Sequence, residues 1–263
     1  INTELIISKN TQKSTDEDYL SAYALYSATI RMMEVNQFPF TYHFADQTEK
    51  ENYQEQYEES YAYYNRELRA GGYTIYTSLN PEIQAKAQEI IDESLSKFQE
   101  VQENGKFSMQ GAAVIIDNKS GYVVATIGGR GTEDKYNRAY LSFRQPGSAI
   151  KPLLDYAPAL DLGVFRAASL IDDHKWEDGP SNSGGNYHGE VTIREATNRS
   201  LNTVAWQVLE AVGIKNGLAY LENMHFLGLS LRDYDALAVS IGGFTHGLRI
   251  VDMAKGYSTL ANG

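Results

Sequence analysis

Cysteine is missing from this sequence of 263 residues. Its absence excludes a disulfide framework and any site built on a thiolate. Long apolar runs are missing too, since no stretch reaches the roughly 18 residues that a membrane-spanning helix needs. No signal peptide is recognisable at the start of the chain.

Positive charge is scarce: 23 Lys and Arg stand against 34 Asp and Glu, which gives a formal net charge of −11. Without a basic run, the chain has no electrostatic footprint for nucleic acid and no attraction to an anionic membrane surface. The histidines are also few and scattered, and no two have the spacing of metal ligands on one helix face. We therefore expect no metal site from His43, His174, His188, His225 and His246.

The residues present turn attention to a serine and a lysine three positions apart, Ser148 and Lys151. Pro146 and Gly147 break the preceding structure, and the apolar run 149–160 predicts a buried helix that Ser148 opens. Residues at i and i+3 share a helix face, so an amine there can take the proton of a hydroxyl. Unpaired N–H groups at the helix start favour developing negative charge, and burial would lower the pKa of Lys151.

A second motif, Ser200-Leu201-Asn202, follows about fifty residues later. Short motifs of this kind prove little alone, because Ser94 and Lys97 have the same spacing as the first pair. Ser94 and Lys97 fall near the end of a helix predicted from Asn80 and Pro81 onward, where a lysine complements the helix dipole. We therefore interpret the Ser94 and Lys97 pair as structural.

The two motifs occur in the order of the penicillin-recognising acyl-serine enzymes, Ser-x-x-Lys and then Ser-x-Asn. Over residues 70 to 263 the chain resembles the transpeptidase domain of class A penicillin-binding proteins. The similarity follows one order through residues 111–117, 128–130, 137–139, 144–148, 186–196, 200–203, 240–243 and 253–263, and residues 71–81 resemble the linker before that domain. The third family motif, Lys-Thr/Ser-Gly, does not follow Asn202 in this sequence.

The resemblance implies an α/β fold of the penicillin-binding transpeptidase (β-lactamase-like) type, a sheet flanked by helices, incomplete in this chain. We expect an N-terminal helical linker region at 1–70, a strand–helix linker at 71–110, and the N-terminal part of the transpeptidase domain at 111–263. The family is membrane-anchored and usually carries a glycosyltransferase domain. Neither part is recognisable, so we expect a soluble, truncated piece that is unstable without the strands of its missing half.

The resemblance also implies a DD-transpeptidase at the extracytoplasmic face of the bacterial membrane, acting on peptidoglycan stem peptides that end in D-Ala-D-Ala. Ser148 would form the acyl-enzyme, Lys151 would be the general base, Ser200 a proton relay, and Asn202 would orient the lysine and the substrate amide. β-Lactams would acylate the same serine, with no cofactor or metal. The implied partners are the stem peptides, β-lactam antibiotics and the missing C-terminal part that carries Lys-Thr/Ser-Gly.

Two alternatives stay open. A serine β-lactamase shares these motifs but adds a water-activating residue for fast deacylation. A non-catalytic penicillin-binding sensor or scaffold would use the same pocket without turnover. At the level of single residues, Ser148 could be a simple helix cap, Ser200 a hydroxyl on a helix, and Asn202 a local cap.

Periodicity and turn residues predict the remaining elements. Tyr53, Tyr57, Tyr61 and Tyr64 have helical spacing and are interpreted as a packing stripe. Capping boxes are predicted at 14–17 and 192–195. Helices are predicted at 14–36, 47–69, 203–212, 214–226 and 249–261, strands at 73–77, 111–117 and 122–127, and a long loop at 172–190.

Overall fold

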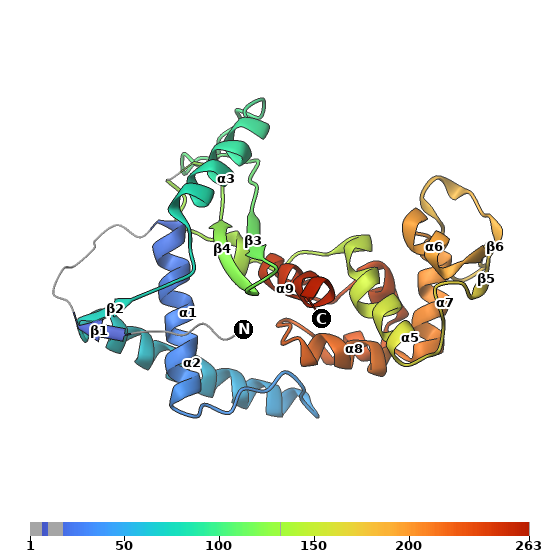
Figure 1. The fold of residues 1–263 in the computed structure, drawn as a ribbon, viewed down its shortest axis with the longest axis horizontal. Coiled ribbons are helices and arrows are strands. Elements are labelled where there is room, and N and C mark those ends of the chain that lie inside the picture. The colour runs from blue at the N-terminus through green and yellow to red at the C-terminus, as the bar shows by residue number, and fades with distance from the viewer. Residues whose placement is uncertain (1–6, 10–17, 132, 263) are drawn as a thin grey trace. The chain divides into compact units, whose positions relative to one another are not determined.

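A computed structural model describes residues 7–9, 18–131 and 133–262. The described residues form two compact units (Figure 1). Unit 1 comprises those of Ile1–Ser142 and Ser258–Gly263, and unit 2 comprises Phe143–Tyr257. These units divide the chain at other places than the segments 1–70, 71–110 and 111–263, which stay a prediction. Within the described part, no helix combines the length and apolar composition needed to cross a bilayer.

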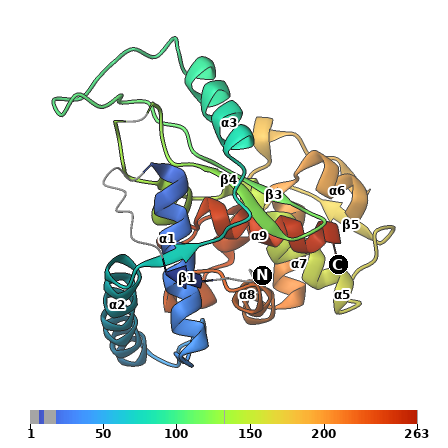
Figure 2. The same ribbon diagram turned by 60° about the vertical axis from the view of Figure 1, so that its left-hand side comes forward.

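Unit 1 contains the helices α1 (Tyr19–Val35) and α2 (Gln47–Ala70), which lie side by side in both views (Figures 1 and 2). Each has an aspartate cap: Asp18 accepts from the Ser21 N–H at 2.7 Å and Asp46 from the Glu49 N–H at 2.8 Å. The capping box predicted at 14–17 lies outside the described residues. The helix predicted at 47–69 is confirmed.

The tyrosine stripe of α2 is a packing surface, as predicted. The ring centroids of Tyr53, Tyr57 and Tyr61 follow one another at 6.2 and 6.1 Å, and Tyr61 contacts Tyr26 of α1 at 6.2 Å. Tyr64 instead meets the ring of its neighbour Tyr63. Three of the four predicted rings therefore belong to one aromatic row.

Strand β1 (Ile7–Lys9) pairs with β2 (Tyr73–Ile75), and helix α3 (Pro81–Ser94) follows. The side chain of Asn80 caps α3 by accepting from the Glu82 and Ile83 N–H groups at 2.9 and 3.1 Å. Strands β3 (Ala113–Asp117) and β4 (Tyr122–Ile127) form an antiparallel hairpin whose turn is held by Asp117. The predicted hairpin is confirmed, and the strand predicted at 73–77 ends two residues early.

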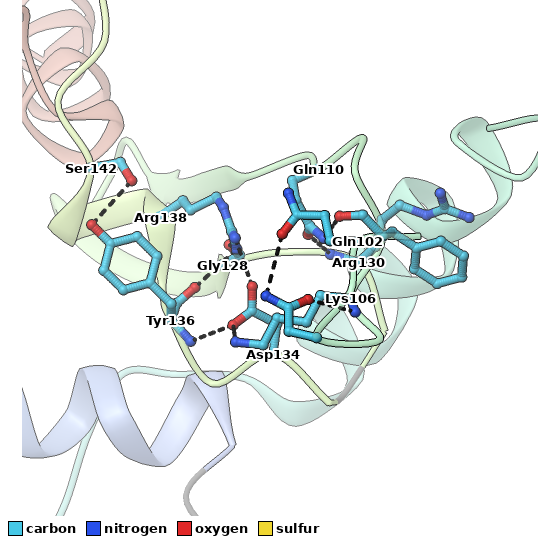
Figure 3. Close-up of polar contacts among 11 residues, drawn as sticks. Gln102, Lys106, Gln110, Gly128, Arg130, Asp134, Tyr136, Arg138 and Ser142 are labelled. Carbon is cyan, nitrogen blue, oxygen red and sulfur yellow. Dashed lines mark hydrogen bonds and ion pairs between the residues drawn. The ribbon is translucent and has the colours of Figure 1, made fainter. Parts of the chain in front are cut away.

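A buried carboxylate organises the loop between β4 and the short helix α4 (Arg138–Leu141) (Figure 3). Asp134 accepts from Lys106 Nζ at 2.7 Å, from Arg138 Nη2 at 2.6 Å and from the Tyr136 N–H at 3.2 Å. Burial alone would raise the pKa of Asp134, but these donors lower it to about 2. Arg138 also donates to the carbonyl of Gly128 at 3.2 Å, which ties the loop to the end of β4.

Unit 2 opens with a helical segment that changes type twice. It runs from a 3₁₀ turn, η1 (Gly147–Ile150), through a π-helical stretch, η2 (Pro152–Tyr156), into α5 (Ala157–Asp161). The single regular helix predicted at 149–160 is therefore wrong in type. Pro152 and Pro158 provide no N–H group, so the α-helical ladder is interrupted at both positions.

Next, β5 (Leu170–Asp173) and β6 (Gly189–Thr192) pair antiparallel, so the loop predicted at 172–190 is shortened to 174–188, with a 3₁₀ turn η3 (Ser183–Gly185) inside it. Thr192 caps α6 by accepting from the Glu195 N–H at 3.1 Å. The side chain of Glu195 accepts from Arg199, so the predicted capping box is present only in the bond from the Glu195 N–H to the Thr192 side chain. The remaining elements are α6 (Ile193–Arg199), α7 (Asn202–Val212), α8 (Ile214–Asn223), η4 (Leu231–Asp235), η5 (Leu237–Ile241) and α9 (Ile250–Asn262).

Helix α7 is the centre of unit 2 because apolar side chains on it enter two buried clusters. Leu209 packs with Leu153 and Leu154 of η2 and with residues of α8, while Val204 and Val208 pack with residues of β6 and α6. Figures 1 and 2 show α7 next to β5. The described chain thus combines helices with three two-stranded sheets, as an incomplete α/β fold does.

Candidate active site

Three of the four predicted site residues meet at the start of α7. The amine of Lys151 donates to the carbonyl of Ser200 at 2.7 Å, to its hydroxyl at 3.2 Å and to Oδ1 of Asn202 at 2.6 Å. Lys151 is only 2% exposed. An ammonium group has three hydrogens to donate, and each finds an oxygen here.

The backbone of Ser200 creates this arrangement. Ser200 ends α6 in the left-handed region, with φ of 56°. A non-glycine residue in that region costs on the order of 1–3 kcal/mol, and such strain is concentrated at functional sites. The sharp turn presents both the carbonyl and the hydroxyl of Ser200 to one amine, and it starts α7 only two residues later.

Asn202 is the first residue of α7, and its side chain is held at both ends. Its Nδ2 donates to the carbonyl of Ser181 at 2.8 Å, which leaves Oδ1 on the amine of Lys151. The Asn202 side chain therefore joins the lysine to the 174–188 loop. A merely local cap, the simple alternative for Asn202, would contact neither of them.

Ser148 is not hydrogen-bonded to this group in the described residues. It is exposed in η1, and no hydrogen bond joins its hydroxyl to Lys151 in the described part of the chain. The sequence argument assumed an α-helical turn, whereas residues 147–150 form a 3₁₀ turn. Hydrogen bonds between catalytic groups are often long before substrate binds. The pairing of Ser148 with Lys151 stays a prediction.

Residues 242–248 contact the turn that carries Ser148 and two residues that precede it. Gln145 accepts from the N–H of Phe244 at 2.8 Å and donates to its carbonyl at 2.5 Å. Arg144 and Leu248 form a β-bridge. Gly242 has φ of +89°, and a Cβ on it would lie 2.3 Å from the backbone nitrogen of Gly147. Sequence reasoning used residues 240–243 only for the resemblance and gave Gln145 no role, although both stand inside matched segments.

Burial sets the protonation of the lysine. Desolvation lowers the pKa of Lys151 from 10.5 to about 8, against the opposing effect of the nearby Asp155 carboxyl. This is the direction predicted from the apolar run around it. A large fraction of free amine is therefore available near pH 8.

Asp155 is a buried acid that the sequence analysis missed. It is fully buried in η2, and neither of its carboxyl oxygens has a hydrogen-bond partner in the described structure. Burial raises the pKa of Asp155 well above 3.8, although the charge of Lys151 acts in the opposite direction. A buried carboxyl without donors is more stable in the protonated form. A charged residue inside the apolar run 149–160 was the available signal.

The comparison with known families agrees with this architecture. The family described as "Penicillin binding protein transpeptidase domain" matches residues 111–262. The chain belongs to this family of transpeptidase domains, and the predicted resemblance is confirmed.

Two curated relatives illustrate the similarity. Penicillin-binding protein 4 of Bacillus subtilis (strain 168) is 35% identical over 199 residues, which cover 74% of this chain and 30% of that protein. Penicillin-binding protein 1A of Clostridium perfringens (strain 13 / Type A) is 37% identical over 172 residues, covering 59% of this chain and 25% of that protein. The chain thus spans less than a third of the length of these relatives.

Among solved structures, the PonA1 protein from Mycobacterium tuberculosis in complex with penicillin V matches with a TM-score of 0.63. The match covers 93% of this chain and 59% of that chain at 21% identity, and it supports the fold alone. Penicillin-Binding Protein 1A from Haemophilus influenzae matches at 27% identity with a TM-score of 0.50, covering 62% of this chain and 26% of that chain. The predicted fold class is therefore confirmed.

Proposed function

We propose that this chain contributes the acylation centre of a peptidoglycan DD-transpeptidase, with Ser148 as nucleophile. One observation carries the proposal most strongly. In a chain of this family, a buried lysine with a lowered pKa has its amine on Ser200 and Asn202, and the exposed Ser148 lies in the 3₁₀ turn that opens the same helical segment.

The proposed reaction starts with a stem peptide ending in D-Ala-D-Ala. The free amine of Lys151 takes the proton from the Ser148 hydroxyl while its oxygen attacks the penultimate D-Ala carbonyl. The peptide bond to the terminal D-Ala breaks, and that D-Ala leaves as an amine after receiving a proton through Ser200. The acyl group then passes from Ser148 to the amine of a neighbouring stem, which forms the crosslink and returns the proton.

Asn202 has a supporting part in this scheme. Its Oδ1 holds the Lys151 amine at 2.6 Å, so the lysine keeps one position in both protonation states. We also propose that a β-lactam acylates Ser148 in place of the stem peptide. The proposed place of action is the extracytoplasmic face of the bacterial membrane, and the partner of this site is a strand carrying the family's Lys-Thr/Ser-Gly motif.

Labelling with a fluorescent penicillin tests the proposal. The full-length protein carrying these residues is incubated with the reagent, digested, and the modified peptide is mapped by mass spectrometry. We expect one adduct, on Ser148, and none in Ser148→Ala. Ser94→Ala is the matched control, because Ser94 and Lys97 repeat the motif spacing at the end of α3. An adduct on any other residue contradicts the assignment.

The fate of the adduct distinguishes the transpeptidase from the two alternatives. A transpeptidase keeps the penicilloyl group for a long time and crosslinks nascent peptidoglycan strands. Loss of the adduct within minutes would instead identify a serine β-lactamase. A stable adduct without any crosslinked product from lipid-linked substrate would identify a sensor or scaffold.

A further inference from the structure

The first turn of α7 is capped from outside its own segment. The residue before the helix is Leu201, whose side chain accepts no hydrogen bond. The free N–H groups of a helix start usually bind an Asn, Asp, Ser or Thr at that position. Here Oδ1 of Asn182, on the 174–188 loop, accepts from the Asn202 N–H at 2.8 Å and from the Thr203 N–H at 3.3 Å.

Asn182 is itself held firmly. Its Nδ2 donates to Oδ1 of Asp173 at 2.7 Å and to the carbonyl of Asn186 at 3.0 Å. Asn182 is 6% exposed and Asp173 is 1% exposed. Both ends of the Asn182 amide are therefore used, and its orientation is determined by its surroundings.

Asp173 completes the network at the end of β5. It also accepts from the hydroxyl of Thr203 and, at 2.9 Å, from the N–H of His188. We call Asp173, Asn182 and Thr203 the Asn182 network. It links β5, the 174–188 loop and the first turn of α7 through buried polar groups, and each side chain in it has a hydrogen-bond partner. Buried networks that are fully satisfied give a single arrangement of the groups they join.

The neighbouring residue of the loop acts on the Asn202 side chain. The carbonyl of Ser181 accepts from Asn202 Nδ2 at 2.8 Å, while Asn182 binds the Asn202 backbone. Two consecutive loop residues thus determine where Asn202 lies and which way its amide points. The outcome is the 2.6 Å contact from Lys151 to Asn202 Oδ1.

We propose that Asn182 is a positioning residue for acyl transfer, which keeps the oxygen of Asn202 on the amine of Lys151. The inference rests on the proposed function, because it assigns Asn182 a part in the same reaction. It acts through Asn202 and the lysine, without contact with substrate. A misplacement of catalytic groups by about 1 Å can slow a reaction on the order of a hundredfold.

Asn182→Ala in the full-length protein tests the role. We expect Ser148 acylation by a fluorescent penicillin to slow by about tenfold to a hundredfold. We also expect the midpoint of its pH profile to move to lower pH, because the Lys151 ammonium loses an ordered acceptor. Asp155, the ionisable group near Lys151, is unchanged in this variant. A merely structural role would lower the amount of active protein without moving the midpoint.

Asn186→Ala is the matched control. Asn186 lies on the same loop, its backbone carbonyl remains, and its side chain makes no hydrogen bond in the described part of the chain. It should acylate at the wild-type rate. If Asn182→Ala folds poorly, Asn182→Asp can replace it in the test. This variant places a second carboxylate against Asp173 and should slow acylation of Ser148. Adding Asp173→Asn removes one of the two carboxylates and should recover most of the lost acylation rate. Failure of the double variant to exceed Asn182→Asp counts against the proposal.

Amide hydrogen exchange supplies a readout that needs no penicillin. The Asn202 and Thr203 N–H groups should exchange at least about tenfold faster in Asn182→Ala than in the wild type. Unchanged exchange would overturn the capping role. A labelled wild type together with an unchanged rate and midpoint in Asn182→Ala would overturn the positioning role. If the wild type is not labelled at Ser148, the proposed function is contradicted. The hydrogen-exchange result still tests, on its own, whether Asn182 caps α7.

Discussion

We expect the rate of Ser148 acylation by a penicillin to rise with pH and to level off above a midpoint near the pKa of Lys151. Burial lowers that pKa from 10.5 to about 8. This shift corresponds to about 3 kcal/mol of preference for the neutral amine. The lysine is 2% exposed, so solvent screens little of this effect.

The shift predicts the shape of the profile. Because the base must be neutral, the rate follows the fraction of free amine. With a pKa of about 8, that fraction is about a tenth at pH 7 and about nine tenths at pH 9, so the rate should increase about tenfold. An ordinary lysine would give about a hundredfold increase over the same interval and would still be rising at pH 10.

The assay measures initial rates of fluorescent penicillin incorporation at Ser148 from about pH 6 to about pH 10. Lys151→Arg keeps a cation that cannot be deprotonated, so its acylation should be lost at every pH. Lys97→Arg is the control for a general effect of arginine and should retain the wild-type profile. A rate that climbs without a plateau would refute the lowered pKa, and an unaltered profile in Lys151→Arg would refute the role of the base.

Two further predictions concern the surroundings of the pair. Gly242→Ala should destabilise the protein by about 3 kcal/mol and slow acylation, because its Cβ would overlap Gly147. Gly185→Ala is the control, because Gly185 also has a positive φ but has open space around it. This variant should keep the wild-type acylation rate in the same assay. Burial raises the pKa of Asp155, so the folded state binds a proton that the unfolded state releases, and stability falls as pH rises above about 4. Asp155→Asn should therefore melt at a higher temperature than wild type at pH 7 and at a similar one at pH 4, whereas a lower melting temperature at pH 7 would indicate an ionised Asp155 paired with Lys151.

Elements that depend on local pattern could be predicted from the sequence. The β3–β4 hairpin followed from its turn residues, α2 from the helical spacing of its tyrosines, and α3 from periodicity and a recognisable start. The helical segment after Ser148 was misjudged because apolar composition outweighed two prolines. Pro152 and Pro158 were visible in the sequence, and their missing N–H groups explain the irregular ladder.

The site was harder to predict because it joins distant segments. Lys151 and Ser200 are 49 positions apart, and only the family resemblance indicated that they meet. Asn182 was missed although it lies in the loop that was predicted, since nothing local distinguishes a buried asparagine from a loop asparagine. Its hydrogen bonds to Asn202 and Asp173 become apparent only with the chain folded.

The proposed nucleophile, Ser148, and its proposed base, Lys151, are three positions apart in the sequence, yet different parts of unit 2 hold them. The Ser148 turn is attached to residues 242–248 through Gln145 and Gly242. The Lys151 amine is attached to Ser200 and Asn202. The apolar core joins these two attachments, because it contains side chains of η1, η2 and α7 together with Phe244 and Leu248. Changes at Gly242 act on the hydroxyl and changes at Asn182 act on the amine, so only the latter should move the pH midpoint of acylation.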